Sequence, residues 1–356
     1  MPQVCDNCYF QTVGEPLARF LRPSAADRLV HRFVHLCHAY DAEARERRRG
    51  SHSGRDGSSA GAAEQAAVQK VTYAAMARAR RECQLSGSMH APEVEFLAAI
   101  YPEDREYASA YFDRFVMLQR TASDLRTFAR PRLLPPLFDI LELATDARAD
   151  YIVFTNVDIC PVPNFYLAVD ALLRQGFDAL VINRRTLIGW PIDPGLVDMM
   201  ALDAGQPHEG YDCFVFPRQL LADFIRNDAV VGTSGVMMGL IYNLVATTRR
   251  LLFLGDVHLT WHLGDDKAWA SPELRDYIEH NWSESLITLL RLSRIKPERF
   301  QEFCRHFPRS RVALQSDGSG RIRLGRKHDF HGFLPDLQAV EGRVEKMGGG
   351  SAQASR

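Results

Sequence analysis

An amide and a carboxylate stand two residues apart directly after an apolar run of the chain. Residues 151–155 (YIVFT) are β-branched and aromatic, which is typical of a central parallel strand covered on both faces. Asn156 and Asp158 follow this run and share one side, because strand side chains alternate. Oxygen donors so placed suit a hard divalent cation that carries phosphates. The alternative is a strand-ending turn in which both side chains cap the backbone.

A second concentration of polar residues lies in the segment 255–266 (GDVHLTWHLGDD). Its histidines, His258 and His262, are four residues apart and are flanked by aspartates. Neutral imidazole binds divalent metals well when a neighbouring acceptor orients the ring, and Asp256 or Asp265 would supply that acceptor. The alternative is a helix or turn in which both histidines are hydrogen-bonded fillers.

Four arginines are expected at the same edge of the sheet. Arg130 and Arg132 lie beside prolines, ahead of the helix that leads to the strand at 151–155. Arg184 and Arg185 end the next strand along the chain. A guanidinium at this edge can bind a diphosphate through two hydrogen bonds and stabilise charge on a leaving group. Ordinary surface ion pairs explain any single one of them equally well.

Strands that alternate with helices define the first half of the chain. Such alternation implies βαβ units and a mainly parallel sheet flanked by helices, the α/β class, and ligands bind such sheets at the carboxyl ends of the strands. The expected strands are 33–38, 94–100, 151–155 and 179–183, and the expected helices are 64–83, 106–128, 137–146 and 164–175. Beyond residue 190 the pattern predicts strands at 212–216 and 251–254, with helices at 217–226, 236–248 and 272–306.

One domain with a helical C-terminal portion accounts for this order. Residues 1–30 are expected to form a lead-in and 31–335 the single domain. The Gly-, Ser- and Arg-rich stretch 42–63 has no apolar face, so we expect a mobile surface loop there. The end of the chain, 336–356, is expected to be a disordered tail.

Composition narrows the class of protein. The chain has 356 residues, of which 46% are hydrophobic and 24% charged, and its net charge of −1 gives no field that favours nucleic acid. We expect no integral membrane segment, because no run of about 18 apolar residues free of charge occurs. The N-terminus lacks the pattern of a secretory signal. The scattered cysteines, with Cys5 and Cys8 as the single CxxC, fit a reduced pair better than a zinc site, so a cytoplasmic protein is expected.

The segment 151–166 (YIVFTNVDICPVPNFY) resembles the metal-binding "DxD" segment of GT-A-fold glycosyltransferases. The resemblance extends over Gln69–Met76, the strand 94–100 and Arg130–Pro135, then forward to the strand 179–183 and, more loosely, to Gly255–Trp269. It covers about two thirds of the chain. The first carboxylate of the motif is replaced by Asn156, which leaves one charged ligand where many members have two.

This resemblance implies a GT-A-like, Rossmann-like fold and a nucleotide-diphosphate sugar as donor. It also implies Mn²⁺ or Mg²⁺ held by Asp158 and by a histidine late in the chain. His258 is the first choice for that histidine and His262 the second. If His258 binds the metal, His262 is expected to bind the substrate. The arginines and Asn156 would bind the donor, and residues 190–335 would include the acceptor side. Inverting transfer needs a carboxylate that takes the proton of the acceptor hydroxyl. Asp212 is the first candidate, Asp265 the second and Glu284 a further alternative. The acceptor is unknown.

Rival functions remain open. A nucleotidyltransferase would use the same edge and metal, but it normally has a Gly-rich basic loop after its first strand. A non-catalytic relative that binds a sugar nucleotide without turnover, or binds none, stays open because of Asn156. A Rossmann dehydrogenase and a P-loop kinase are disfavoured, because neither glycine motif follows an expected strand.

Overall fold

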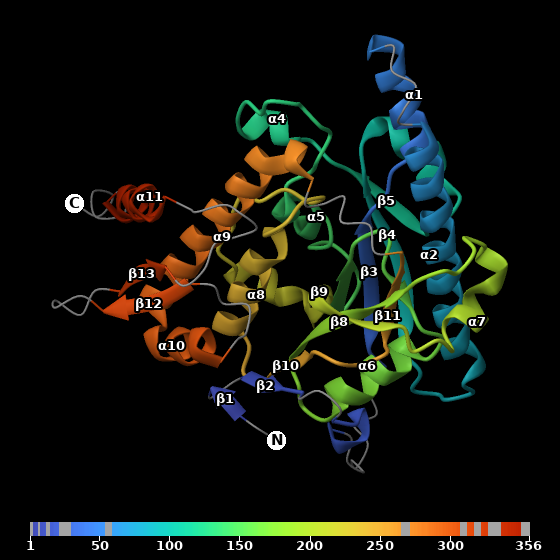
Figure 1. Ribbon diagram of the computed structural model, residues 1–356. Coiled ribbons are helices and arrows are strands. Elements are labelled where there is room, and N and C mark those ends of the chain that lie inside the picture. The colour runs from blue at the N-terminus through green and yellow to red at the C-terminus, as the bar shows by residue number, and fades with distance from the viewer. Residues whose placement is uncertain are drawn as a thin grey trace.

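A large mixed sheet runs through the molecule and carries helices on both faces (Figure 1). The computed structural model describes residues 3–5, 8–11, 15–20, 30–53, 59–264, 271–306, 312–316, 322–326 and 336–349. The strands of the sheet are β1 (Gln3–Cys5), β2 (Cys8–Phe10), β3 (Arg32–His38), β4 (Glu93–Ile100), β5 (Arg114–Met117), β6 (Tyr151–Thr155), β7 (Cys160–Pro161), β8 (Ala179–Leu187), β9 (Gln206–Pro217), β10 (Leu251–Leu254) and β11 (Thr260–Leu263). Their order is β1-β2-β10-β8-β9-β6-β3-β4-β5, with β11 pairing both β8 and β7.

Most neighbouring strands of the sheet are parallel. β3 lies between β4 and β6 and is parallel to both, and β5 extends this parallel group beyond β4. β9 runs antiparallel between β6 and β8, so β6 and β8 point the same way. β10 and β11 each pair in parallel with β8. The predicted fold class, an α/β protein with a mainly parallel sheet flanked by helices, is confirmed.

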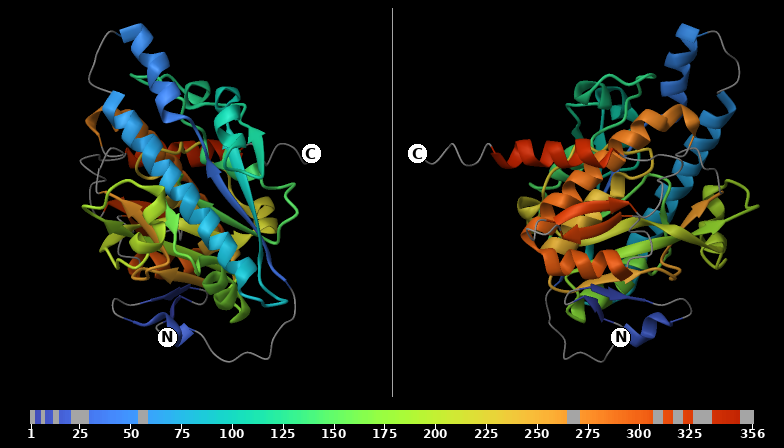
Figure 2. Two further views of the ribbon diagram at one scale, coloured as in Figure 1. Left: turned by 90° about the vertical axis from the view of Figure 1, so that its right-hand side faces the viewer. Right: turned by 60° about the vertical axis from the view of Figure 1, so that its left-hand side comes forward.

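Helices cover the two faces unequally. The helices are α1 (Ala42–Ser53), α2 (Ser59–Leu85), α3 (Arg105–Ser109), α4 (Ala122–Leu125), α5 (Leu137–Glu142), α6 (Phe165–Arg174), α7 (Val197–Met200), α8 (Val236–Thr247), α9 (Arg275–Ile295), α10 (Pro297–His306) and α11 (Leu337–Gly349). Short 3-10 turns lie at Leu17–Phe20, Pro102–Asp104, Pro194–Leu196, Arg218–Asp223 and Pro272–Leu274. The view on the left of Figure 2 shows α2 crossing one face of the sheet, and α8 and α9 lie on the other face.

Burial on both faces explains why the run 151–155 forms the central strand. Ile152 and Phe154 are completely buried in the core cluster shared with α5, α8 and α9, whereas Val153 is buried in the cluster shared with α2 and α6. The alternation of a strand therefore places every second side chain in each core. β6 is held at the middle of the sheet, and its carboxyl end has a fixed position.

The expected helix over 106–128 is wrong. The structure has the short α3, the strand β5 and the short α4 in its place. α3 ends at Ser109, and the carboxylate of Asp113 holds the following segment beside β4 by accepting a hydrogen bond from the backbone N–H of Phe96 at 2.8 Å. Thr121 and Asp124 then form a capping box that starts α4.

The loop expected over 42–63 is helical in the residues that the structure describes. α1 begins after Asp41, whose side chain accepts a hydrogen bond from the N–H of Ala44 at 2.8 Å. Arg47 and Glu43 form an i,i+4 ion pair, with 3.3 Å between Nη1 and Oε2. α2 already begins at Ser59. Capping and local ion pairs thus form a helix where the lack of an apolar face predicted a loop.

The described residues near both ends of the chain include elements that pack on the rest of the structure. In the lead-in, β2 joins the main sheet as the parallel neighbour of β10. In the expected tail, α11 buries Val340 and Val344 against the core, and Arg343 Nη2 lies 2.8 Å from Oε1 of Glu284. The hairpin of β12 (Val312–Ser316) and β13 (Ile322–Arg326) forms a separate two-stranded sheet. Within the described residues, no helix is both long and apolar enough for a membrane span.

Candidate functional site

The turn after β6 carries Asp158 and leads into β7, which pairs antiparallel with β11. In that pairing Trp261 lies opposite Cys160. The next residue, His262, comes to lie beside Asp158, with 3.4 Å between Nε2 and Oδ2. The structure therefore joins the two polar segments that the sequence singles out, at the carboxyl edge of the parallel strands.

The backbone determines which nitrogen of His262 faces Asp158. Nδ1 lies 3.0 Å from the carbonyl oxygen of Gly264, and a carbonyl only accepts, so Nδ1 carries a proton. Nε2 then faces the carboxylate with either a second proton or a lone pair. If Nε2 has a lone pair, it repels the negative carboxylate of Asp158, and a cation between the two groups would relieve this repulsion. Two ligands of one octahedral ion lie about 3 Å apart, since bonds of about 2.1 Å meet near right angles.

The charges of the pair support one another. Burial disfavours the ionised form of Asp158, but the hydrogen bond and charge of His262, together with Arg184, outweigh it and hold the pKa of Asp158 below its ordinary value. Burial likewise disfavours the charged form of His262, yet Asp158 raises the pKa of His262 above its ordinary value. A cation bound here would displace the proton on Nε2, so binding would release protons.

Two oxygen atoms in the turn have no hydrogen-bond partner although they are buried: Oδ1 of Asn156 and Oδ1 of Asp158. Such acceptors are costly unless something satisfies them. In the described residues, no group of three or more His, Cys, Asp or Glu side chains forms a metal site. Asp158 and His262, with the amide oxygen of Asn156, nevertheless fit Mn²⁺ or Mg²⁺, because such ions often take one carboxylate from the protein and other ligands from phosphates and water.

Arg184 and Asp212 form the second pair of the site. Nε of Arg184 lies 3.5 Å from Oδ2 of Asp212, and neither atom has a hydrogen-bond partner. Their side chains are 7% and 17% exposed, so solvent screens the two charges only weakly. Because Arg184 also lowers the pKa of Asp158, the two pairs act as one charged cluster. We call Asn156, Asp158, Arg184, Asp212 and His262 the edge cluster.

The other three arginines have partners elsewhere. Arg185 binds Oδ1 of Asp256 at 2.7 Å and the carbonyl oxygens of Ala204 and Gly205, so it holds a loop in place. Arg130 and Arg132 lie 2.5 Å and 3.6 Å from the carboxylate of Glu273, beside α9. These partners are the surface and loop ion pairs that the sequence left open as the alternative.

His258 does not join the edge cluster. His258 lies in the loop before β11, where its Nε2 atom is buried without a hydrogen-bond partner. Burial and the charge of Arg185 lower its pKa below the ordinary value, although Asp203 opposes them. Asp265 lies outside the described residues. The histidine next to Asp158 is His262, which the sequence ranked second as a metal ligand.

The buried side chain of His35 supports the turn that carries the edge cluster. The Nε2 atom of His35 hydrogen-bonds with Oγ1 of Thr155 at 2.9 Å, and its Nδ1 atom with the hydroxyl of Tyr166 at 2.6 Å. The hydroxyl of Thr72 on α2 lies 3.3 Å from the sulfur of Cys160. These contacts link β3, β6, α6, α2 and β7 around the turn. Sequence reasoning missed this support, although a histidine within the apolar run 33–38 is its signal.

Tyr40 forms the wall of the site next to α1. Burial, followed by the charge of Asp158, raises the pKa of Tyr40 to about 12, and the amide of Gln65 donates to its hydroxyl at 2.6 Å. The guanidinium of Arg45 lies 4.5 Å from the centroid of the Tyr40 ring and forms an ion pair with Asp104 at 2.6 Å. Arg45 falls in the stretch expected to be a loop, so its part in this wall had no signal in the sequence.

Comparisons with known proteins give structural neighbours alone. No family model matches the chain, and no curated protein matches it. Residues 1–349 of TarS from S. aureus, solved with UDP-GlcNAc, are 10% identical with a TM-score of 0.43, over 77% of this chain and 73% of that one. Glucosyl-3-phosphoglycerate synthase from Mycobacterium tuberculosis, solved with Mn²⁺ and UDP-glucose, is 15% identical with a TM-score of 0.38, over 94% of this chain and 98% of that one. At these values neither likeness extends to function.

Proposed function

We propose that the chain is a glycosyltransferase that transfers a sugar from a nucleotide-diphosphate donor, with a divalent cation bound between Asp158 and His262. The observation that carries this proposal is the 3.4 Å approach of His262 Nε2 to Asp158 Oδ2 at the carboxyl edge of the sheet. The resemblance of residues 151–166 to the DxD segment supports the same assignment. The buried cysteines Cys37, Cys83, Cys160 and Cys213 are free, which supports the further proposal of a cytoplasmic enzyme.

Three side chains would hold the cation and the donor. Asp158 and His262 would bind Mn²⁺ or Mg²⁺, and the unpartnered oxygen of Asn156 would complete the protein's share of the ligands. The ion supplies electrostatic stabilisation of the departing diphosphate when it is bound. Because Asn156 carries no charge, this site has one negative charge fewer than a site with two carboxylates, and metal affinity depends on that count.

Arg184 and Asp212 would act on the two ends of the reaction. The guanidinium of Arg184 is buried and has an N–H without a hydrogen-bond acceptor, so it can donate to a phosphate oxygen as negative charge develops there. Asp212 has a carboxylate oxygen without a donor, which can accept the proton of an attacking hydroxyl. Their separation of 3.5 Å would keep both groups close to the donor diphosphate and sugar.

A thermal-shift panel tests the proposal. UDP-, GDP-, CMP- and ADP-sugars are added with and without Mn²⁺ to the wild-type protein and to Asp158→Ala. A ligand that binds the native state increases the free energy of unfolding, by about 2.7 kcal/mol at one hundred times its dissociation constant. The melting temperature rises as a result. We expect a metal-dependent rise with one nucleotide and its loss in the variant.

Turnover separates the two related functions. Release of the nucleoside diphosphate, measured with the nucleotide sugar that binds, supports a transferase. Binding without any release would identify a non-catalytic relative. A panel in which no nucleotide sugar shifts the folded wild-type protein would contradict the proposal altogether.

A further inference from the structure

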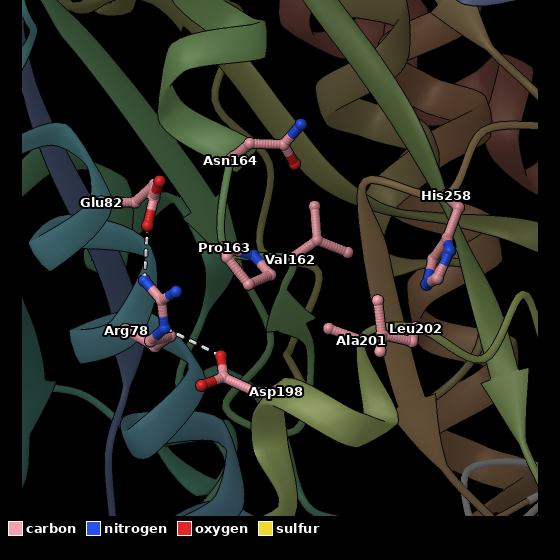
Figure 3. Close-up of a pocket in the computed structure, with 9 residues that line it drawn as sticks. All are labelled: Arg78, Glu82, Val162, Pro163, Asn164, Asp198, Ala201, Leu202 and His258. Carbon is pink, nitrogen blue, oxygen red and sulfur yellow. Dashed lines mark hydrogen bonds and ion pairs between the residues drawn. The ribbon is translucent and has the colours of Figure 1, made fainter. Parts of the chain in front are cut away.

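A pocket of about 360 Å³ lies beyond the far end of the β7–β11 ladder from the edge cluster (Figure 3). Its walls come from α2, from the segment between β7 and α6, from α7 and the residues after it, and from the loop before β11. Pockets of this size hold ligands the size of a sugar ring or larger. No residue of the edge cluster lines it, so it is a separate site.

One wall of the pocket is an ion-pair triad. Arg78 donates to Glu82 at 2.6 Å and to Asp198 at 2.8 Å, so α2 and α7 are tied together. Figure 3 shows these three side chains on one side of the pocket, with His258 across from them. Two carboxylates against one guanidinium leave this wall with a net negative charge. A phosphate or another anion is therefore disfavoured here.

His258 on the opposite wall and Asn164 between the two walls offer neutral hydrogen-bonding groups. His258 has a buried Nε2 atom without a hydrogen-bond partner, and Figure 3 shows its ring directed toward Ala201 and Leu202. Asn164 precedes α6 as its N-cap residue, but its side chain makes no capping hydrogen bond and lines the pocket instead. An amide and an imidazole can each donate and accept, which suits a ligand rich in hydroxyl groups.

The floor and the rim are apolar. Val162 and Pro163 lie between the two walls in Figure 3, and Ala201 and Leu202 close the side formed by the residues after α7. The side chain of Leu202 is 79% exposed, so its apolar surface at the rim is open to a ligand. A pyranose ring presents hydroxyls at its edge and C–H groups on its faces. It therefore matches a pocket with polar walls and an apolar floor.

The ladder sets the distance between the pocket and the edge cluster. Thr260 lies opposite Pro161 in the β7–β11 pairing, and Val162 N–H donates to Leu259 O at 3.0 Å. Asp158 and His262 lie at one end of this ladder, and the pocket residues Val162 and His258 at the other. Four steps of extended chain span at most about 13 Å. A chain of sugars can bridge this length, whereas one ring cannot.

We propose that this pocket is an acceptor subsite that binds a neutral pyranose ring, so that the acceptor is an oligosaccharide or glycoconjugate whose reacting end reaches the edge cluster. The role of this pocket in binding the acceptor rests on the proposed function. The binding of a neutral sugar ring rests on the pocket itself. The triad of Arg78 orients one side of the ring, His258 and Asn164 bind its hydroxyls, and Leu202 covers an apolar face.

Saturation-transfer NMR on the full chain tests the proposal. The probes are the methyl α- and β-pyranosides of glucose, galactose and mannose. We expect transfer to at least one of them in the wild-type protein, and its loss in His258→Ala, Asn164→Ala and Ala201→Trp, the last of which fills the pocket. His90→Ala is the matched control, because His90 does not line the pocket, and it is expected to keep the signal.

The two proposals fail in different ways. Asp158→Ala is expected to keep saccharide contact and to lose the metal-dependent thermal shift by the nucleotide sugar. The three pocket variants are expected to keep that thermal shift, which also shows that they are folded. Wild-type protein that gives no transfer to any of the six glycosides, or pocket variants that keep the wild-type signal, would overturn the subsite and leave the donor site untouched.

Discussion

Nε2 of His262 lies 3.4 Å from Oδ2 of Asp158, although the two residues come from distant parts of the chain. The antiparallel pairing of β7 with β11 brings them together, and the carbonyl of Gly264 orients the imidazole. A ring held by a backbone carbonyl and directed at a carboxylate has the geometry of a metal ligand. This relationship separates the two histidines of the segment 255–266, and it leads to the first prediction.

Replacing Asp158 or His262 by alanine is expected to abolish the metal-dependent part of donor binding. Each change removes one of the two strong donors, so we expect at least a tenfold loss of Mn²⁺ affinity, about 1.4 kcal/mol. His258→Ala is the matched comparison and should bind Mn²⁺ within about twofold of the wild type. Titration of Mn²⁺ by electron paramagnetic resonance measures all three. A larger loss in His258→Ala than in His262→Ala would reverse the assignment of the ligand.

Asn156→Asp is expected to strengthen metal binding. The amide oxygen of Asn156 is buried without a partner, and a carboxylate at the same place would add a charge to the ligand set. We expect the dissociation constant for Mn²⁺ to fall roughly tenfold, and Asn156→Ala to raise it. The same titration applies, with circular dichroism to verify folding. Equal affinities in all three proteins would show that residue 156 caps the turn and binds no metal.

Asp212→Asn is expected to slow turnover and to leave donor binding in place. A positioned proton acceptor contributes about a hundredfold or more to the rate. Release of nucleoside diphosphate, measured beside the thermal shift by the donor, separates the two effects. A variant whose rate stays within threefold of the wild type would remove Asp212 from the proton transfer.

Substitutions of Arg184 test the other member of the Arg184–Asp212 pair. Arg184→Ala leaves the partly buried Asp212 without this cation, so both stability and donor affinity should fall. Arg184→Lys keeps the charge but loses the planar fork that binds a diphosphate. We therefore expect the lysine variant to recover most of the melting temperature but little of the donor affinity. Recovery of both would show that charge alone matters at this position.

The sequence predicts the central strands well because burial on both faces leaves a strong local pattern. β6 and β10 have the bounds that the apolar runs 151–155 and 251–254 indicate. The position of Asp158 at the end of β6 could be predicted for the same reason, since Asp158 follows such a run. The choice between His258 and His262 depends instead on the register of β7 against β11, which is a long-range property that residue spacing does not contain.

Expectations that depend on long-range packing have weak local patterns. Arg130 and Arg132 stay predictions as ligands of the diphosphate, and the structure adds that Glu273 beside α9 pairs with both of them. β5 is a four-residue strand whose residues are only partly buried, too short to interrupt an apparent helical pattern. The helix α11 has few apolar residues, and its burial depends on a partner surface formed far away in the chain.

His35 predicts a loss of stability in mild acid. Burial lowers the pKa of His35 to about 3, whereas in the unfolded chain it returns to about 6.5. Between these values the unfolded chain binds one proton more, so the free energy of unfolding falls by up to about 1.4 kcal/mol for each pH unit below 6.5. Burial also lowers the pKa of His38 to about 3, so a second proton contributes in the same window.

His35→Gln is expected to remove about half of that slope. Glutamine has no titration in this range and can still hydrogen-bond with Thr155 or Tyr166, so some of the support under the turn is kept. Urea unfolding between pH 7 and pH 4.5 measures the slope for each protein. His90→Gln is the control for the loss of a histidine outside the core. The prediction is wrong if the His35 variant shows the full wild-type slope.

The helix α11 is expected to stabilise the whole domain. Val344 is 4% exposed and packs into the core cluster that α8 and α9 share, while Gln338 on the same helix is exposed. Val344→Ala should lower the free energy of unfolding by roughly 2 kcal/mol, because it deletes two buried methyl groups and leaves a cavity. Gln338→Ala should change it by less than about 0.5 kcal/mol. Urea unfolding followed by tryptophan fluorescence compares the two. If both variants unfold like the wild type, α11 does not dock on the core, and the expectation of a disordered tail over 336–356 would be restored.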